Sequence, residues 1–410
     1  MHDRQGPVAA AGHRAGGPSV LLLGLLAALN AFGIDSYVAA LPTMQRELHA
    51  GAVAVQSTVA AYLAGLASGQ LLWGWASDRF GRKRPLLLAL AVLCLSSLGC
   101  GMAGNIGALV LFRFVQAIGS AGAATIAYAL VADHWAATER ARIFSRLSQL
   151  IGATAITAPL LGAGILALAS WRAIFVLFSL VAAAMAVWVA CGLRQEGRAD
   201  ATGRCGTAGG FRSLLVEDGF RASLLVAGLS NGAMLAVLTA SSFVLVGQFG
   251  WTSGGYAGFY AISSFLFILC AQWNVVLLRK LTPRAILWRV SWIITLLAAL
   301  LLAGILSGLS GAPGYVAIAG AYLALLGLVL GNVASIAMEG VPPALAGRAA
   351  SLLGISQFLA GSLLVPLATA LEPVALSVAL VFLGCAAGVL PCAARLRASA
   401  NKRICKSGNF

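Results

Sequence analysis

Two ionisable side chains, Asp35 and Arg113, lie inside long apolar segments of this chain. An ionisable group inside a membrane is costly, so each of the two is a candidate for function. Burial disfavours the charged carboxylate and a nearby arginine favours it, so a change in their separation could load and release a proton. A fixed pair that only joins two helices is the structural alternative. We predict that Asp35 and Arg113 form a proton-coupling pair.

A second group of charged residues stands in a short break between two apolar segments, in the run GWASDRFGRKR from Gly74 to Arg84. Its aspartate can accept hydrogen bonds from backbone N–H groups at a neighbouring helix start, and its arginines can pair with a carboxylate on another helix. We expect a conformational latch that breaks and re-forms between helices, and not a ligand site. Its candidate members are Gly74, Asp78, Arg79, Gly81, Arg82, Lys83 and Asp133.

Uncharged polar and aromatic residues inside the apolar segments are candidates to line a binding cavity. Each of them alone is more often a hydrogen-bond partner between helices, so we expect about a third to contact a substrate. Glu339, at the end of an apolar segment, is expected to be an interfacial charge near Arg348 and not a second proton site. The cavity candidates are Asn30, Tyr37, Tyr62, Gln70, Tyr128, Asn231, Gln272, Asn332 and Gln357.

The composition requires a membrane around these side chains. Of 410 residues, 60% are hydrophobic and 10% are charged, whereas a soluble domain carries about 25% charged residues. The net charge of +15 would suggest nucleic-acid binding in a soluble protein, but the charges fall in short breaks between apolar runs. The eight cysteines show no zinc or disulfide spacing, and the four histidines lie outside or at the edges of the runs. We therefore expect no metal, no cofactor and no nucleic-acid partner.

Twelve apolar runs are each close to the ~20 residues that a helix needs to cross a bilayer core of ~30 Å. We predict an all-α polytopic membrane protein with 12 transmembrane helices in two pseudo-symmetric six-helix bundles. At ~1.5 Å per residue, Asp35 and Arg113 lie at a similar depth, ~8–9 Å below the outer ends of their helices. The predicted spans are 19–41, 54–76, 85–104, 108–131, 145–169, 171–193, 221–246, 255–278, 285–308, 314–338, 348–371 and 374–394.

Positive charge predicts the orientation of these spans. All of the 27 Lys and Arg except Arg46, Arg113 and Arg172 fall on one side if both termini are cytoplasmic. The longest connection separates two halves of six spans, an arrangement typical of transporters with a site between two repeats. The predicted domains are a cytoplasmic tail 1–18, a six-helix bundle 19–193, a cytoplasmic linker 194–220, a second bundle 221–394 and a basic cytoplasmic tail 395–410.

The run from Gly74 to Arg84 resembles the loop signature of the major facilitator superfamily. Two further matches resemble drug:proton antiporters of that superfamily. In span four the matching residues are Leu109, Arg113, Gln116 and Gly119, and in span five the run APLLGAG keeps Pro159 and Gly162 of the antiporter motif. That motif is expected to bend span five and pack it against its neighbours in the other half. Ala158 and Ala163 replace glycines of the motif.

The closest likeness is to the bicyclomycin and chloramphenicol resistance (Bcr/CflA) branch, and it extends over roughly 19–395. It is carried by the runs GIDSYVAALP, TVAAYLAG, WRAIF and GNVASIAMEGVPPALAGRAASLLGISQF. The resemblance implies a proton-coupled antiporter that exports small drug-like molecules, such as amphenicols or bicyclomycin, across the inner membrane by alternating access. Its expected partners are a small-molecule substrate, protons and the lipid bilayer, with the chain functional as a monomer.

The nearest alternative is a proton-coupled exporter, or an uptake symporter, of a metabolite or biosynthetic product. The substitutions in the span-five motif keep this alternative open. An intramembrane enzyme would need a buried nucleophile with a base or a metal set, and the absence of buried histidines and clustered carboxylates from this sequence argues against one. A membrane sensor that transports nothing is a further alternative.

Overall fold

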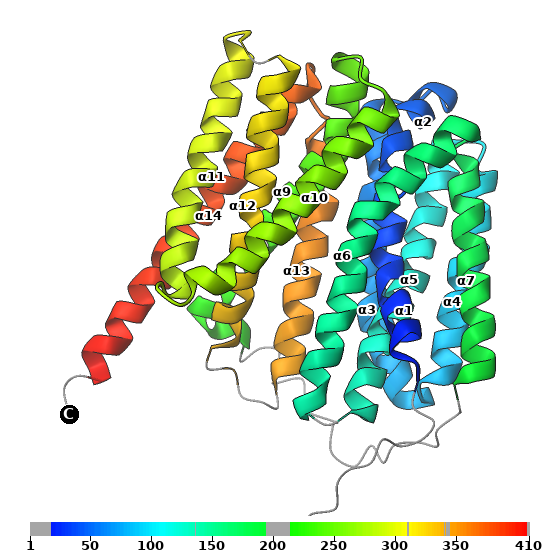
Figure 1. Cartoon of the computed structure of the whole chain (residues 1–410), viewed down its shortest axis with the longest axis horizontal. Helices are drawn as coiled ribbons and strands as arrows, with labels where there is room; N and C mark the ends of the chain where they lie inside the picture. The colour runs from blue at the N-terminus through cyan, green and yellow to red at the C-terminus, as the bar shows by residue number, and fades with distance from the viewer. Residues whose placement is uncertain are drawn as a thin grey trace, which may run out of the picture.

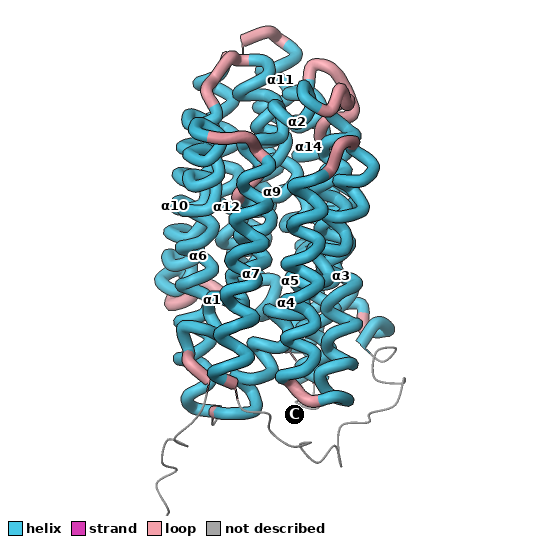
Figure 2. The backbone as a smooth tube through the Cα atoms, turned by 90° about the vertical axis from the view of Figure 1, so that its right-hand side faces the viewer, coloured by secondary structure: helices cyan, strands magenta, loops and turns pink. Residues whose placement is uncertain are grey.

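The structure is a computed structural model that describes residues 18–135, 137–193, 214–309, 311–339, 341 and 345–407. The predicted tail 1–18, apart from its last residue, and most of the predicted linker 194–220 therefore lie outside the described residues. The described chain consists of long helices joined by loops that gather at the two ends of the molecule (Figure 2).

The first half begins with α1 and is built from short connections and long apolar helices. Asn105 caps one of them, because its side chain accepts a hydrogen bond of 2.8 Å from the backbone N–H of Ala108. The predicted tight turn near Ser170 is confirmed, since only 169–171 separate two helices. The spanning helices are α1 Val20–Asp35, α3 Ala52–Phe80, α4 Lys83–Met102, α5 Ile106–His134, α6 Ala137–Leu168 and α7 Arg172–Gly192.

The second half has the same number of spanning helices, and threonine side chains cap two of them. Thr252 and Thr282 accept from the backbone N–H groups of Gly255 and Ala285, and Pro283 occupies the first position of its helix. The helices are α9 Asp218–Ser242, which continues into the π-helix η2 Phe243–Gln248, then α10 Ser253–Leu277, α11 Pro283–Leu306, α12 Ala312–Met338, α13 Ala346–Leu367 and α14 Val374–Ser407.

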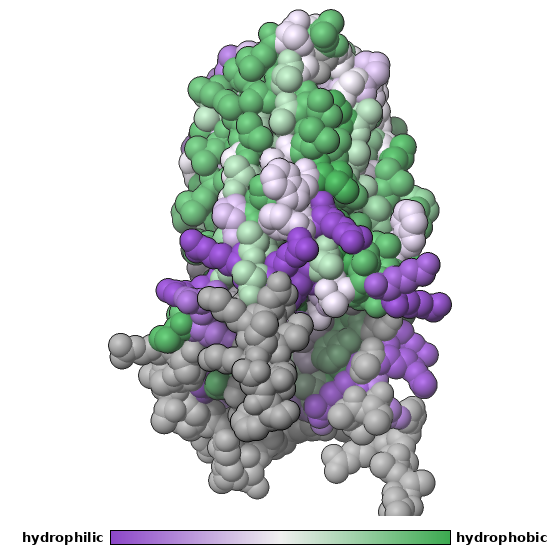
Figure 3. Space-filling model, turned by 90° about the vertical axis from the view of Figure 1, so that its left-hand side faces the viewer, coloured by the Kyte–Doolittle hydropathy of each residue, from purple (hydrophilic) through white to green (hydrophobic). Residues whose placement is uncertain are grey.

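Twelve spans within the described chain are long and apolar enough to cross a membrane, which confirms the predicted number. Large apolar side chains such as Trp273 (64% exposed) and Leu363 (65%) face outward from them. Figure 3 shows one such face as a broad hydrophobic surface, with hydrophilic side chains gathered below it. A surface of this kind is solvated by lipid and not by water.

The helices pack as two six-helix bundles. In the first half α3 and α4 pack against α5, α4 also packs against α7, and α1 packs against α6. In the second half α9 packs against α13 and α14, while α11 packs against α12 and α14. The most extensive helix contacts between the halves are those of α3 with α13 and of α6 with α10. Figure 1 shows α6 and α10 crossing in front of the molecule. The predicted fold class is therefore confirmed.

Two segments of the structure differ in detail from the predicted spans. The first span is interrupted after Asp35, and it continues as a 3-10 turn, η1 Val38–Ala40, and a short helix, α2 Leu41–Glu47. Pro42 explains the interruption, since a proline has no N–H and its ring excludes the carbonyl four residues earlier. The last helix, α14, extends to Ser407, so the predicted basic tail 395–410 is helical over most of its length.

The two ends of the bundle are distinguished by the chain termini. Both the start of α1 and the end of α14 lie at the lower end in Figure 1, which we call the N-side. The loop between α3 and α4 lies at the same end. The opposite end, which we call the far side, carries α2 and η2.

Candidate functional site

A cavity of about 460 Å³ lies between the two halves. Most of its wall is apolar, including Ile34 and Leu235 from α1 and α9 and Phe358 from α13. Such a pocket, apolar with a few polar groups, is typical of a small-molecule site. Its polar and ionisable lining residues are Asn30, Asp35, Tyr128, Ser148, Asn231, Tyr260, Ser263 and Ser264.

The lining residues of the cavity differ in exposure from one end to the other. Tyr128, near the N-side end of α5, is 39% exposed, and Ser148, near the N-side start of α6, is also exposed. Asp35 and Tyr260, at the far end of the cavity, are 6% and 2% exposed. The exposed residues lie at one end and the buried ones at the other, so the site is accessible from the N-side.

The far side is closed by contacts between the halves. The short helix α2 contacts η2, and η1 contacts α9 and α10. Pro42 and Gln45 of α2 lie across a shallow surface pocket from Val246 and Gly247 of η2. Glu47 fastens α2 within its own half, because it accepts hydrogen bonds from Trp171 at 2.7 Å and Arg172 at 3.0 Å. We call the contacts of η1 and α2 with the second half the far-side gate.

Asp35 stands at the closed end of the cavity, where α1 ends. One of its carboxylate oxygens accepts a hydrogen bond of 2.5 Å from the hydroxyl of Tyr260 on α10. This bond crosses from the first half of the chain to the second. Among the described lining residues, Asp35 is the single carboxylate and none is a lysine or arginine. The cavity is therefore suited to neutral or cationic molecules and unsuited to anions.

Arg113 is fully buried behind the cavity wall, entirely within the first half. Its guanidinium donates to the side-chain oxygen of Gln116 at 2.6 Å and to the backbone carbonyl of Gly33 at 2.9 Å. It also lies about 4 Å from the ring centres of Tyr37 and Tyr62. Neutral acceptors and the faces of aromatic rings thus stabilise this charge inside the protein.

The expected direct contact between Asp35 and Arg113 is wrong for this conformation. Their similar depth is not enough, because direction around the helix also matters. Gly33 and Asp35 are two residues apart, which turns the chain by about 200° around the axis of α1. The carbonyl of Gly33 faces Arg113. Asp35 consequently faces the other half and Tyr260.

Gly162 of the antiporter-like motif lies directly behind this site. A Cβ atom at that position would lie 1.6 Å from the carbonyl oxygen of Ser36, so only glycine allows α6 to approach the break in α1 this closely. Pro159 lies one turn earlier inside the same helix. The motif was expected to pack span five against the other half. The helix that carries it, α6, does pack against α10 of the other half, while Gly162 itself packs against the residue after Asp35 in its own half.

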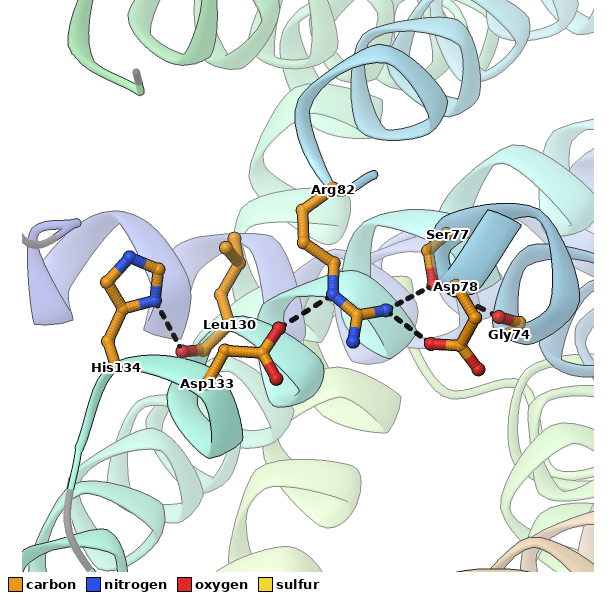
Figure 4. Close-up of polar contacts among 7 residues, drawn as sticks. All are labelled: Gly74, Ser77, Asp78, Arg82, Leu130, Asp133 and His134. Atoms are coloured by element: carbon orange, nitrogen blue, oxygen red, sulfur yellow. Dashed lines mark hydrogen bonds and ion pairs between the residues drawn. The ribbon is translucent and has the colours of Figure 1, made fainter. Parts of the chain in front are cut away.

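The predicted latch forms a network around Arg82, as Figure 4 shows. The Arg82 guanidinium donates to Asp133, at the end of α5, and to Asp78 on α3, both at 2.8 Å. It also donates to the hydroxyl of Ser77 at 2.8 Å. Partial burial opposes the charge on Arg82, but the hydrogen bonds and charges of the two aspartates outweigh it and raise the pKa of Arg82 above its usual value.

The remaining latch residues have separate roles. Gly81 adopts a positive φ of 80°, which allows the tight turn between α3 and α4. Lys83 donates to the carbonyl of Ala190 near the end of α7, at 2.8 Å. Arg79 lies over Trp75 and Phe80 of its own helix. A Cβ atom at Gly74 would meet no neighbour, so close packing does not require that glycine.

Two expectations about the latch are wrong. Asp78 does not accept from a neighbouring helix start, because it is 72% exposed and bonds Arg82 four residues along the chain. The motif is also not a loop, since Gly74–Phe80 are part of α3. All the contacts described for the network lie within the first half. In this conformation it therefore braces three helices of one half and does not join the halves.

Of the nine polar cavity candidates, Asn30, Tyr128 and Asn231 line the cavity. Tyr37 and Tyr62 instead hold Arg113. Asn332 donates to Asn274 at 2.7 Å, as an interhelical partner inside the second half. Gln70, Gln272 and Gln357 are not among the lining residues. Three of the nine therefore line the cavity, and the expectation that about a third contact a substrate stays a prediction.

Sequence reasoning missed Tyr260 together with Ser263 and Ser264. These residues and Tyr256 recur every three to four positions along α10, so they share one helix face. That spacing was a usable signal. Glu339 was expected near Arg348, and the ion pair that the structure gives it is with Arg284, at 2.6 Å.

Comparison with known proteins agrees with this architecture. Residues 23–366 match the family model described as Major Facilitator Superfamily. The chain is 32% identical over 236 residues to an uncharacterized MFS-type transporter, YdgK, of Bacillus subtilis, covering 56% of this chain and 58% of that protein. It is 27% identical over 258 residues to a bicyclomycin resistance protein homolog of Haemophilus influenzae, covering 62% of this chain and 65% of the relative. These matches span less than two thirds of the relatives' own length.

A solved structure supports the fold over a greater length. The crystal structure of a bacterial homolog to the human lysosomal transporter Spinster, inward-facing and unoccupied, aligns with a TM-score of 0.70 over 92% of this chain and 95% of that one. The two share 15% of their residues, so this likeness concerns the fold alone. With the matched family model, the twelve spans and the cavity between two six-helix halves, the chain belongs to the Major Facilitator Superfamily of membrane transporters.

Proposed function

We propose that this transporter exports small drug-like molecules from the cytoplasm in exchange for protons. One observation carries the proposal: a single carboxylate, Asp35, ends the cavity between the halves and holds a partner from the opposite half. An isolated carboxylate in a membrane cavity can bind a proton or a substrate, and each changes its interaction with that partner.

The orientation follows from the distribution of charge. The N-side carries the basic residues from Arg79 to Arg84, where α3 ends and α4 begins, and the arginines at the end of α14. Short loops rich in lysine and arginine remain in the cytoplasm. We therefore place the N-side, and with it both termini, in the cytoplasm and the far side outside the inner membrane. The cavity described above is then open to the cytoplasm.

The cycle needs two conformations of the same site. In the conformation described here, Asp35 releases its proton into the cytoplasmic cavity, and a substrate enters. After the halves rock, the far-side gate opens, and a proton from outside binds Asp35 and displaces the substrate. Inward movement of the proton supplies ~2.3 kcal/mol per net charge for every 100 mV of membrane potential.

The cavity and the relatives together suggest the substrate class. An apolar wall with one carboxylate and several hydroxyl and amide groups suits a neutral or cationic amphipathic molecule. The Haemophilus relative is named a bicyclomycin resistance protein homolog. We infer antibiotics of that type, bicyclomycin or amphenicols, as first compounds to test. Export or uptake of a metabolite or biosynthetic product remains the alternative.

Everted vesicles test the proposal, because their cytoplasmic face is exposed. With a preformed gradient, acidic inside, addition of a transported antibiotic should collapse part of the pH gradient with the original protein. Asp35→Asn should abolish this response, since the amide keeps the size of the side chain and removes the titration. Glu372→Gln, a change to an exposed carboxylate between α13 and α14 that does not line the cavity, is the matched control and should respond normally.

The same measurement separates the alternatives. An uptake symporter would show no substrate-induced proton release from these vesicles, and it would accumulate substrate in right-side-out vesicles instead. Full proton exchange by Asp35→Asn would place the coupling site elsewhere and refute the proposal.

A further inference from the structure

We infer that Tyr260 is a positioning residue that holds the far-side gate closed through the charged carboxylate of Asp35 until a proton or a hydrogen-bond donor of the substrate takes its place. This inference rests on the proposed function and deepens it. It assigns a role to a residue of the second half, and it states what a substrate must offer to be carried.

The hydrogen bond has the position that such a lock requires. Asp35 is the last residue of α1, immediately before η1 and α2, which form the first half's part of the gate. Tyr260 lies on α10, which contacts η1 directly. The hydroxyl donates to the carboxylate at 2.5 Å where both side chains are buried. Opening the far side separates η1 from α10, so this bond must break.

The surroundings leave Tyr260 as the donor. The other titratable or charged groups near Asp35 are Tyr62 on α3, Tyr256 on α10 and Arg113 on α5. The Tyr256 hydroxyl donates to the carbonyl of Leu238 at 2.6 Å, and Arg113 bonds Gln116 and the Gly33 carbonyl. Within the described residues, Tyr260 is the group that bonds the carboxylate.

The strength of this bond depends on the state of Asp35. A hydrogen bond to an ionised carboxylate is roughly twice as strong as one between neutral groups, and a buried site strengthens it further. When Asp35 is charged and the cavity is empty, Tyr260 therefore holds the halves together at the far side. A proton on the carboxylate weakens the bond. A hydroxyl, amide or ammonium group of a substrate competes for the same oxygens.

The consequence is tight coupling. An antiporter must not open its far side with an empty, charged site, because a proton could then bind from outside and enter the cell without any substrate leaving. The lock blocks this step alone, since both the protonated and the substrate-bound forms release it. Molecules without a hydrogen-bond donor should occupy the apolar cavity without releasing the gate, and we expect them to bind without being exported.

Hydrogen–deuterium exchange of the purified full chain in lipid nanodiscs tests the lock. The readout is the exchange rate of backbone amides in α2 and η2 at one alkaline pH, without substrate. We expect Tyr260→Phe and Asp35→Asn each to raise this rate at least about ten-fold, the factor implied by the loss of a hydrogen bond to a charged group. The double variant should exchange no faster than either single one.

Tyr256→Phe is the matched control. It removes a hydroxyl from the same helix face, one turn away, that bonds a backbone carbonyl and not Asp35. Exchange in α2 and η2 should remain as in the original protein. Equal acceleration by Tyr256→Phe would refute the inference, because the effect would then reflect general loosening of α10.

The outcomes also separate the inference from the proposed function. If Asp35→Asn loses substrate-induced proton release while Tyr260→Phe leaves exchange in α2 and η2 unchanged, the proton site stands and the lock is wrong. If Tyr260→Phe raises exchange and also lets protons leave acidic everted vesicles without added substrate, the lock is confirmed. Normal proton coupling by both variants would refute the two proposals together.

Discussion

Two arginines in the first half lie in opposite environments. The comparison shows how the permanent charge of an arginine can be kept apart from the carboxylate of Asp35, which we propose gains and loses a proton. Arg113 is fully buried and bonds no carboxylate among the described residues; its charge is stabilised by Gln116, a backbone carbonyl and aromatic rings. Arg82 lies at the N-side and bonds two carboxylates, Asp78 and Asp133.

The interior arrangement leaves Asp35 available for exchange. If Arg113 bonded Asp35 directly, the carboxylate would remain ionised and protonation would require breaking a buried ion pair. Because neutral groups accept the hydrogen bonds of Arg113, the partner that Asp35 has among the described residues is Tyr260, in the other half. The surface network has no such requirement. Its charges are paired within one half, where they fix the ends of α3, α4 and α5.

The largest effect is expected from Arg113→Leu. The change removes a buried charge and leaves the Gly33 carbonyl and the Gln116 oxygen without their donor, at about 1–3 kcal/mol for each group. The thermal midpoint of the purified protein should fall by several degrees, and transport should be lost. Arg46→Leu, an exposed arginine on α2, is the control and should change stability by less than about 0.5 kcal/mol. Equal midpoints for the two variants would contradict the role assigned to Arg113.

A smaller effect is expected from Gly162→Ala, which tests whether the interior cluster depends on close packing. The new methyl group would overlap the Ser36 carbonyl, so α6 must move away from the break in α1, at a cost of about 1–3 kcal/mol. Transport should fall strongly while the protein still inserts. Gly164→Ala, two residues on, meets no neighbouring atom and should transport normally. If both variants transport alike, the contact between Gly162 and Ser36 has no functional role.

The number of spans and the residues of the surface network were predictable from sequence, because both depend on local patterns. Apolar runs of fixed length define the helices. Asp78 and Arg82 follow one another closely in the sequence, and Asp133 lies at the end of another predicted helix. The predicted topology therefore places these opposite charges on the same side of the membrane. The break after Asp35 was missed, since the residues from Val38 to Leu41 continue the apolar run and only Pro42 interrupts it. Hydropathy reports burial and not backbone continuity.

The partner of Asp35 could not be predicted in the same way. Depth in the membrane follows from counting residues, but the rotation of α1 and the register between the halves are set by packing. Gly162 fixes how closely α6 approaches α1, and α10 then brings Tyr260 to the carboxylate. A contact between residues 225 positions apart leaves no periodic trace in either segment.

The smallest change in stability is expected from Asp78→Asn, which tests the surface side of the comparison. Asp78 is 72% exposed and Arg82 retains Asp133, so the loss should not exceed about 1 kcal/mol. The network lies outside the cavity, and substrate affinity measured by equilibrium binding should therefore remain unchanged. Turnover should fall, because the ends of α3, α4 and α5 must move as one unit when the halves rock, and a weakened brace lets them move separately. If Asp78→Asn lost substrate affinity while turnover per bound substrate stayed unchanged, Asp78 would be part of the binding site. The surface network would then have the same kind of role as Asp35 in the interior, and the distinction between the two regions would be wrong.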